Sequence, residues 1–257
     1  MYKKLNAAGF RSILGVADDY RVDGLLVTGT GLQPKEAEHE RLTTALTELG
    51  IPYTIERMGN RFYRDVLVIN IGGKRLWYDI TYGAAYLSQL AHMACVLGSP
   101  QNILLGSCGA LQKGMHTNDL VIPIASYGNE SATRLYQPEN TTFIYPSDNG
   151  LHNRIKTQLG SCGVIHEGVS VTVQALYAET DEIIAEWSKA GYGSVDMETA
   201  TFFAVCNHFD KPAAALLQVF DNLIEDQSMY ATSEVVLAAM QQRRIANYKV
   251  AIQTLME

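Results

Sequence analysis

The chain has 257 residues, of which 18% are charged and 47% hydrophobic, a composition typical of a folded globular protein rather than a disordered one. Its formal net charge of -7 argues against a broad surface for polyanions, so nucleic acid is not an expected partner. The four cysteines form no CxxC pair, and neither a signal peptide nor a membrane-spanning run is apparent, which predicts a cytoplasmic protein with no membrane partner.

Apolar runs typical of strands alternate along the chain with helical segments. We expect strands at 24–27, 53–57, 65–71, 75–81, 102–105, 120–125, 163–174, 192–195 and 213–220, with Gly72 and Gly73 forming a hairpin turn. We expect helices at 34–49, 82–97, 151–159, 179–190, 197–209 and 228–256, and an irregular connection over 127–148. This order predicts an α/β fold in which helices flank a mixed, largely parallel central sheet, as one domain over residues 1–257.

The most polar strand exit follows the buried run 213–220, where Asp221 and Asn222 stand. Ligands of open α/β sheets bind beyond the carboxyl ends of the strands, so Asp221 is a candidate general acid. The structural alternative is an ordinary Asp-Asn turn, which this pair alone would favour.

A second candidate is the pair Met197 and Glu198, which follows the strand at 192–195 and opens a helix. Glu198 can accept two hydroxyl hydrogen bonds, as a sugar diol would offer, and Met197 can supply an apolar floor for a ring. The structural alternative is a Glu in the first helical turn that complements the helix dipole.

Two glycine-containing strand exits could let a ligand approach the backbone. One contains Ser107, Cys108 and Gly109, and the other contains Gly29. The second is neither a complete dinucleotide fingerprint nor a P-loop, so it indicates only a weak anion site. The six histidines show no metal-ligand spacing, and no metal site is predicted.

Together these segments resemble the nucleoside phosphorylase and nucleosidase superfamily. The segment ILLGSCGALQKGMHTNDLVIPIA (103–125) is similar to the central strand, glycine turn and next strand of the family. GVSVTVQALYAET (168–180) is similar to its base-binding strand, and SVDMETATFFAVCNHFDKPAAALLQVFDN (194–222) to its sugar-binding helix and catalytic strand. The similarity runs over about residues 21–256, and its specific part is the Met-Glu pair at a fixed distance before a strand that ends in Asp.

The resemblance implies roles for individual positions. Glu198, next to Met197, would hold the 2′ and 3′ hydroxyls of a ribose, and Asp221 would protonate or hydrogen-bond a purine base at N7. Tyr177, with Leu176, would line the base pocket. Ser107 matches a serine that contacts phosphate in the family, and Gly29 matches the glycine of its phosphate-binding loop.

The phosphate site departs from the family pattern. Two positions that carry phosphate-binding arginines in phosphorylases are Gln33 and Leu104 here, and Lys35 does not offer the bidentate geometry of an arginine. Arg57 could replace an arginine that a neighbouring subunit donates. The Gln and Arg that pyrimidine-cleaving members use are also absent, which favours purines.

Three hypotheses follow from the resemblance. The first is phosphorolysis of purine nucleosides, with inorganic phosphate as co-substrate and no organic cofactor. The second is hydrolysis, for which Glu36 and Glu38 are weak candidates for the base. The third is a catalytically impaired relative that binds a nucleoside. The family also implies a homo-oligomer, such as a dimer or a hexamer.

Overall fold

The computed structural model of the chain describes residues 5–30, 34–59, 63, 65–161, 163–225, 227 and 233–257. Its strands are β1 (Gly24–Gly29), β2 (Tyr53–Arg57), β3 (Leu67–Ile71), β4 (Lys74–Thr81), β5 (Asn102–Ala110), β6 (Leu120–Tyr127), β7 (Ile144–Pro146), β8 (Ile165–Thr172), β9 (Ser194–Asp196) and β10 (Ala213–Asn222). Its helices are α1 (Ala7–Leu14), α2 (Lys35–Glu48), α3 (Ala84–Val96), α4 (Ser131–Tyr136), α5 (Asn149–Leu159), α6 (Asp181–Lys189), α7 (Thr199–His208) and α8 (Glu234–Met256), with a 3₁₀ turn at Leu176–Ala178.

Within the described residues, these strands form one mixed sheet in the order β10-β6-β8-β9-β5-β1-β4-β3-β2, with β7 added on β6. Strand β10 also pairs with β5, so β5, β9, β8, β6 and β10 close on themselves as a small barrel. The longest ladders, β10–β5, β6–β8 and β1–β4, are parallel. The predicted mixed α/β fold is therefore confirmed.

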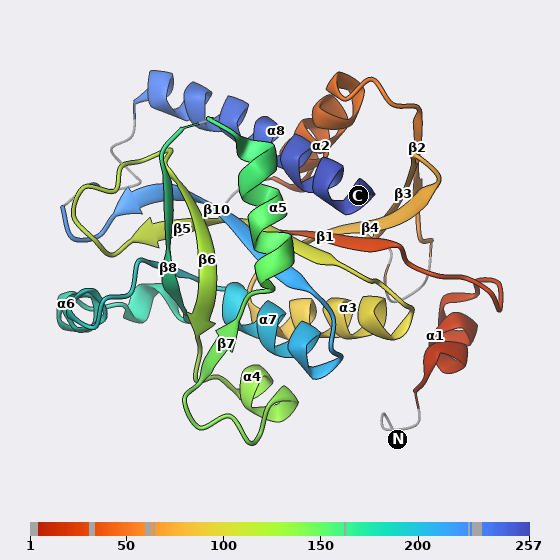
Figure 1. Cartoon of the computed structure of the whole chain (residues 1–257), viewed down its shortest axis with the longest axis horizontal. Coiled ribbons are helices and arrows are strands. Elements are labelled where there is room, and N and C mark those ends of the chain that lie inside the picture. The colour runs from red at the N-terminus through yellow and green to blue at the C-terminus, as the bar shows by residue number, and fades with distance from the viewer. Residues whose placement is uncertain are drawn as a thin grey trace.

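Helices cover both faces of the open part of the sheet (Figure 1). Helices α2 and α8 pack against each other on one face, and α3 packs against α7 on the other. Strand β1 is buried at every position and reads GLLVTG, as expected for a strand covered on both sides. Helix α3 has no charged residue because most of its surface is buried. No helix in the described ranges is long and apolar enough to cross a membrane.

Several segments differ from the sequence prediction. Strand β5 does not stop at Gly106 but continues to Ala110, because its second half pairs with β10 and β9. The connection 127–148 contains α4 and β7. Helix α1 had no sequence prediction. Of the terminal helix predicted at 228–256, positions 228–232 lie outside the described residues, and α8 begins at Glu234.

The pairing registers bring several carboxyl ends of strands to one edge. Gly29 at the end of β1 pairs with Gly106 of β5 and with Thr81 of β4. Further along β5, Gly109 pairs with Asp221 of β10, after a shift in register between Val219 and Asp221. Parallel pairing therefore gathers segments that are far apart in the sequence at one edge of the sheet, where a ligand site is expected.

Candidate active site

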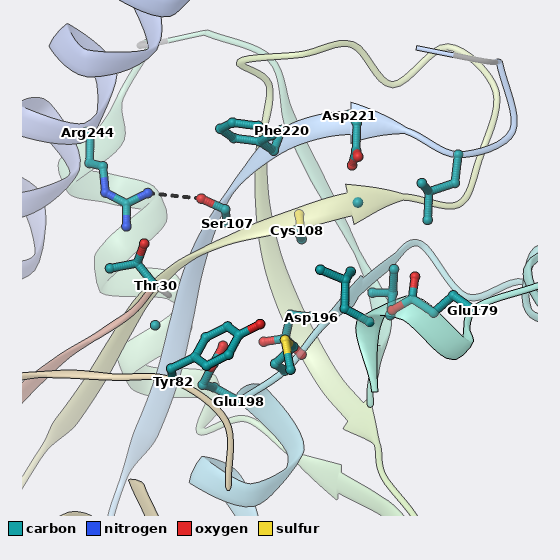
Figure 2. Close-up of a pocket in the computed structure, with 16 residues that line it drawn as sticks. Thr30, Tyr82, Ser107, Cys108, Glu179, Asp196, Glu198, Phe220, Asp221 and Arg244 are labelled. Atoms are coloured by element: carbon teal, nitrogen blue, oxygen red, sulfur yellow. Dashed lines mark hydrogen bonds between the residues drawn. The ribbon is translucent and has the colours of Figure 1, made fainter. Parts of the chain in front are cut away.

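A cavity of about 210 Å³ opens at this edge of the sheet (Figure 2). Four kinds of segment line it: the ends of β1, β5, β9 and β10, the residues that follow β1, β4, β9 and β10, the turn that precedes α6, and the middle of α8. The lining residues are Gly29, Thr30, Tyr82, Ser107, Cys108, Gly109, Leu176, Glu179, Val195, Asp196, Met197, Glu198, Phe220, Asp221, Leu223 and Arg244.

Glu198 stands at the N-cap of α7, but its carboxylate does not cap that helix. Its Oε1 accepts a hydrogen bond of 2.6 Å from the backbone N–H of Gly83. Asp196 takes the capping role, because its Oδ2 accepts from the backbone N–H of Thr199 at 2.9 Å. The helix-dipole explanation of Glu198 is therefore insufficient, since its carboxylate is held at the cavity by another segment.

Gly29 makes room for that carboxylate. A Cβ placed on Gly29 would lie 2.7 Å from Oε2 and 2.9 Å from Cδ of Glu198, closer than such atoms normally approach. The glycine therefore lets the end of β1 lie directly against the Glu198 carboxyl group. In the structure Gly29 therefore contacts the carboxyl group of Glu198.

Burial and, to a lesser extent, the neighbouring charge of Asp196 together raise the pKa of Glu198 to about 8. Burial also raises the pKa of Asp196, although hydrogen bonds from Thr199 and Thr172 oppose the shift. A pKa in this range favours the protonated form of Glu198 at neutral pH. Two hydroxyl donors from a diol would favour its charged form.

Asp221 lies on the other side of the cavity from Glu198 (Figure 2). It belongs to the last part of β10, where it pairs with Gly109, so the Asp-Asn turn is not observed. A Cβ on Gly109 would lie 3.1 Å from Oδ1 of Asp221, so this glycine accommodates the carboxyl group. Burial raises the pKa of Asp221 to about 6, which brings it towards the range of a general acid at neutral pH.

The turn before α6 closes the same end of the cavity with Leu176 and Glu179. Burial and, to a lesser extent, the charge of Asp221 together raise the pKa of Glu179 to about 7. Two carboxyl groups with raised pKa values thus face the cavity at this end. On the β5 side, the buried thiol of Cys108 lines the cavity, and burial raises its pKa, so it remains neutral.

Most of the predicted site residues meet at this cavity. Those that line it are Asp221, Met197, Glu198, Leu176, Ser107, Cys108, Gly109 and Gly29. Tyr177 is not among the lining residues and is 89% exposed, so the structure does not place it where the resemblance expects a contact with the base. Arg57 does not line it either; it lies on the exposed strand β2, 3.8 Å from Asp65.

The sequence prediction missed several lining residues, of which Asp196, Glu179 and Arg244 are ionisable. Arg244 lies in the middle of α8, and Tyr82 follows β4, at the same edge as the other strand exits. The rule that sites follow strands could have found Tyr82. The same rule could not have found Arg244, because Arg244 lies in the middle of helix α8 and not at the end of a strand.

The two candidate bases for hydrolysis lie apart from the cavity. Glu36 is exposed in the first turn of α2, and Glu38 is fully buried. Neither is among the lining residues. Leu104 is fully buried in the core, and Gln33 lies outside the described residues. Within the described ranges, no group of three or more His, Cys, Asp or Glu residues could hold a metal ion.

Comparison with known proteins agrees with this geometry. A guanosine phosphorylase from Halorubrum lacusprofundi is 29% identical over 129 residues, which cover 50% of this chain and 53% of the relative. A purine nucleoside phosphorylase of the DeoD type from Colwellia psychrerythraea is 28% identical over 127 residues, covering 49% and 54%. The chain spans about half the length of the curated relatives it matches.

A solved structure extends the likeness of the fold to nearly the whole chain. Uridine phosphorylase from Vibrio fischeri superposes with a TM-score of 0.71 at 19% sequence identity, covering 95% of this chain and 93% of that one. The family model described as the phosphorylase superfamily matches residues 40–255. That match includes the segments that supply Glu198, Asp221 and most of the cavity. The chain therefore belongs to the phosphorylase superfamily.

Proposed function

We propose that this protein cleaves the N-glycosidic bond of purine nucleosides by phosphorolysis, giving the free base and ribose 1-phosphate. The observation that carries the proposal is the placement of Glu198 and Asp221. Both are buried carboxyl groups with raised pKa values, and they face one cavity, Glu198 from the start of α7 and Asp221 from the end of β10. The purine and guanosine phosphorylases among the relatives support the choice of base.

The chemistry needs both groups in different states. As the bond between C1′ and N9 breaks, positive charge builds on the ribose and the electron pair moves to the purine. A protonated Asp221 can donate its proton to N7, which makes the base a better leaving group. Glu198, ionised by the ribose diol, holds the sugar and places negative charge near the developing cation. An oxygen of phosphate then forms the new bond to C1′.

Burial gives Asp221 the property that this role requires. An exposed aspartate would be almost fully ionised at neutral pH, whereas a pKa of about 6 leaves a useful protonated fraction. Bound base further excludes water from the carboxyl group and favours its neutral form. The raised pKa of Glu179 keeps a second carboxyl group partly neutral beside Asp221, which limits repulsion between the two.

Several further features belong to the same proposal. We infer inorganic phosphate as co-substrate and no organic cofactor, a role in purine salvage in the cytoplasm, and assembly as a homo-oligomer. Arg57 is exposed on β2, as an arginine donated to a neighbouring subunit would be. Size measurement in solution tests the assembly, and loss of phosphate affinity in Arg57→Gln tests that donation.

One assay tests the reaction. The pure protein is incubated with inosine, guanosine, adenosine, methylthioadenosine and uridine, with and without phosphate, and the sugar product is identified. Ribose 1-phosphate that forms only with phosphate is the expected result. Free ribose formed regardless of phosphate would instead establish hydrolysis. Nucleoside binding without any product would establish an impaired relative, and both outcomes would overturn the proposal.

A further inference from the structure

A buried cluster of charged side chains lies next to the cavity, between α2 and α8. Glu38 is fully buried, and it accepts a hydrogen bond of 2.6 Å from Nη1 of Arg41. Nε of Arg244 lies 2.9 Å from Oε1 and 3.1 Å from Oε2 of the same carboxylate. The hydroxyl of Tyr248 also donates to Glu38 at 2.8 Å. Two guanidinium groups thus face one carboxylate.

This cluster leaves one positive charge uncompensated among its own members. Arginine stays protonated in proteins, and Glu38 accepts from three donors, as an ionised carboxylate does. Arg41 and Arg244 are only 9% and 8% exposed. A buried charge is normally paired, so the cluster is suited to an additional anion.

Arg244 is the member of the cluster that reaches the cavity. Its Nη1 donates a hydrogen bond of 2.9 Å to Oγ of Ser107, and both residues line the cavity. Its Nη2 is buried and has no hydrogen-bond partner. In Figure 2 the guanidinium extends from α8 towards Ser107 and Thr30, at the end of the cavity away from Glu179. Buried donors are rarely left unpaired, so Nη2 of Arg244 lacks an acceptor at this end of the cavity.

Ser107 adds a second donor at the same place. Because its oxygen accepts from Arg244, its own hydroxyl hydrogen is directed elsewhere and can donate. Glu38 fixes Nε of the guanidinium, so the terminal nitrogens keep their direction towards β5. The result is a pre-positioned pair of donors, one of them charged, which suits a tetrahedral oxyanion.

We propose that Arg244 is the residue that binds the phosphate co-substrate in this protein. The proposal rests on the phosphorolysis proposed above and names the group that compensates for Gln33 and Leu104. Leu104 cannot take part, because its side chain is fully buried in the core. Arg244 and the hydroxyl of Ser107 donate to the phosphate oxygens, and Glu38 is a positioning residue behind them. The positive charge thus comes from α8 rather than from positions 33 and 104.

Phosphate binding without nucleoside provides the direct test. Inorganic phosphate is titrated into the wild-type protein and into Arg244→Gln, and the heat of binding is measured. Loss of a charge-assisted donor should weaken phosphate binding about 10- to 100-fold. The matched control is Arg243→Gln, which removes the same charge from the next position of α8, where the guanidinium lies against Gly163. The control should bind phosphate within about twofold of the wild type.

Arg244→Lys covers the case in which Arg244→Gln does not fold, because a lysine keeps a cation beside Glu38. It should retain the melting temperature of the wild type more closely but still bind phosphate several-fold more weakly, since it lacks the second N–H of the fork. In steady-state assays, Arg244→Lys should raise KM for phosphate more than KM for inosine. Wild-type phosphate affinity in a folded Arg244→Gln or Arg244→Lys protein would overturn the assignment.

The binding test also separates this proposal from the proposed reaction. Phosphate binding that depends on Arg244 in a protein without nucleoside cleavage would support the assignment and overturn phosphorolysis. Phosphorolysis that proceeds with wild-type KM for phosphate in Arg244→Lys would support the reaction and overturn the assignment. No phosphate binding by the wild-type protein at millimolar concentration would overturn the assignment as well.

Discussion

Replacing Gly29 by alanine tests how the carboxylate of Glu198 is positioned. The added Cβ would lie 2.7 Å from Oε2 of Glu198, about 0.7 Å less than the 3.4 Å at which ordinary contacts begin. Oε1 is held by the backbone N–H of Gly83 at 2.6 Å, so the carboxyl group cannot retreat without losing that bond. The glycine has no positive φ, so the substitution acts through this contact rather than through backbone strain.

The expected loss follows from that displacement. A shift approaching 1 Å in a positioning group can cost about 100-fold in rate, and loss of a hydrogen bond to a charged group costs about 1.5–3 kcal/mol. We therefore expect kcat/KM for inosine to fall about 10- to 100-fold in Gly29→Ala. Because Glu198 is proposed to hold the ribose hydroxyls, the loss should be smaller for 2′-deoxyinosine. The preference for the ribonucleoside should shrink accordingly.

Steady-state kinetics with both nucleosides measures this change. Gly168→Ala is the matched control, because a Cβ on Gly168 in β8 would meet nothing within 4 Å and no positive φ opposes it. If Gly29 instead acts through phosphate, KM for phosphate would rise while the preference between the two nucleosides stayed constant. An unchanged kcat/KM in Gly29→Ala would refute the steric argument altogether.

The carboxyl groups of the cavity give three further predictions. Asp221→Asn should lower kcat for inosine about 100-fold or more with little change in substrate binding. The variant should also lose the decline in kcat/KM that we expect as pH rises through about 6. Equal turnover in the variant and the wild type would rule out Asp221 as the acid. Burial raises the pKa of Glu198 in the folded state, so the stability of the wild type should decline as pH rises from about 4.5 to about 8. The melting temperature of Glu198→Gln should depend less on pH over this range, and equal pH dependence in the two proteins would contradict this. Glu179→Gln should remove an ionisation near pH 7 from the pH profile of kcat/KM and leave the ionisation near pH 6. If both ionisations persist in the variant, the one near pH 7 belongs to another group.

Much of the fold could be predicted because local patterns and tertiary structure agree. The apolar run of β1, the uncharged α3 and the pair Gly72 and Gly73, both of which have positive φ, each specify one structure. The errors came where pairing between distant segments overrides local signals. Glycines at 106 and 109 suggested a turn, yet they remain in β5 because β1 and β10 pair with that part of the strand.

The candidate site divides in the same way. Glu198 follows β9 and Asp221 lies at the end of β10, and the sequence could place both at strand ends and so at one site. Within the 3₁₀ turn 176–178, Leu176 lines the cavity whereas Tyr177 is exposed, a difference that the sequence of this turn does not indicate. The position of Arg244 depends on how α8 packs on α2, and no periodicity within α8 encodes that contact.

The distribution of charge explains why a phosphate-binding arginine on α8 is compatible with an acid at Asp221. A guanidinium close to Asp221 would stabilise its ionised form and lower its pKa, which would remove the proton needed by the base. Here burial raises the pKa of Asp221, and the opposing effect is a hydrogen bond from its own backbone. Arg244 is held at the Ser107 end by Glu38, so its charge can serve an anion there. The fold thus separates an end with Arg244, where we propose that the phosphate binds, from an end with Asp221 and Glu179, where we propose that the leaving base is protonated.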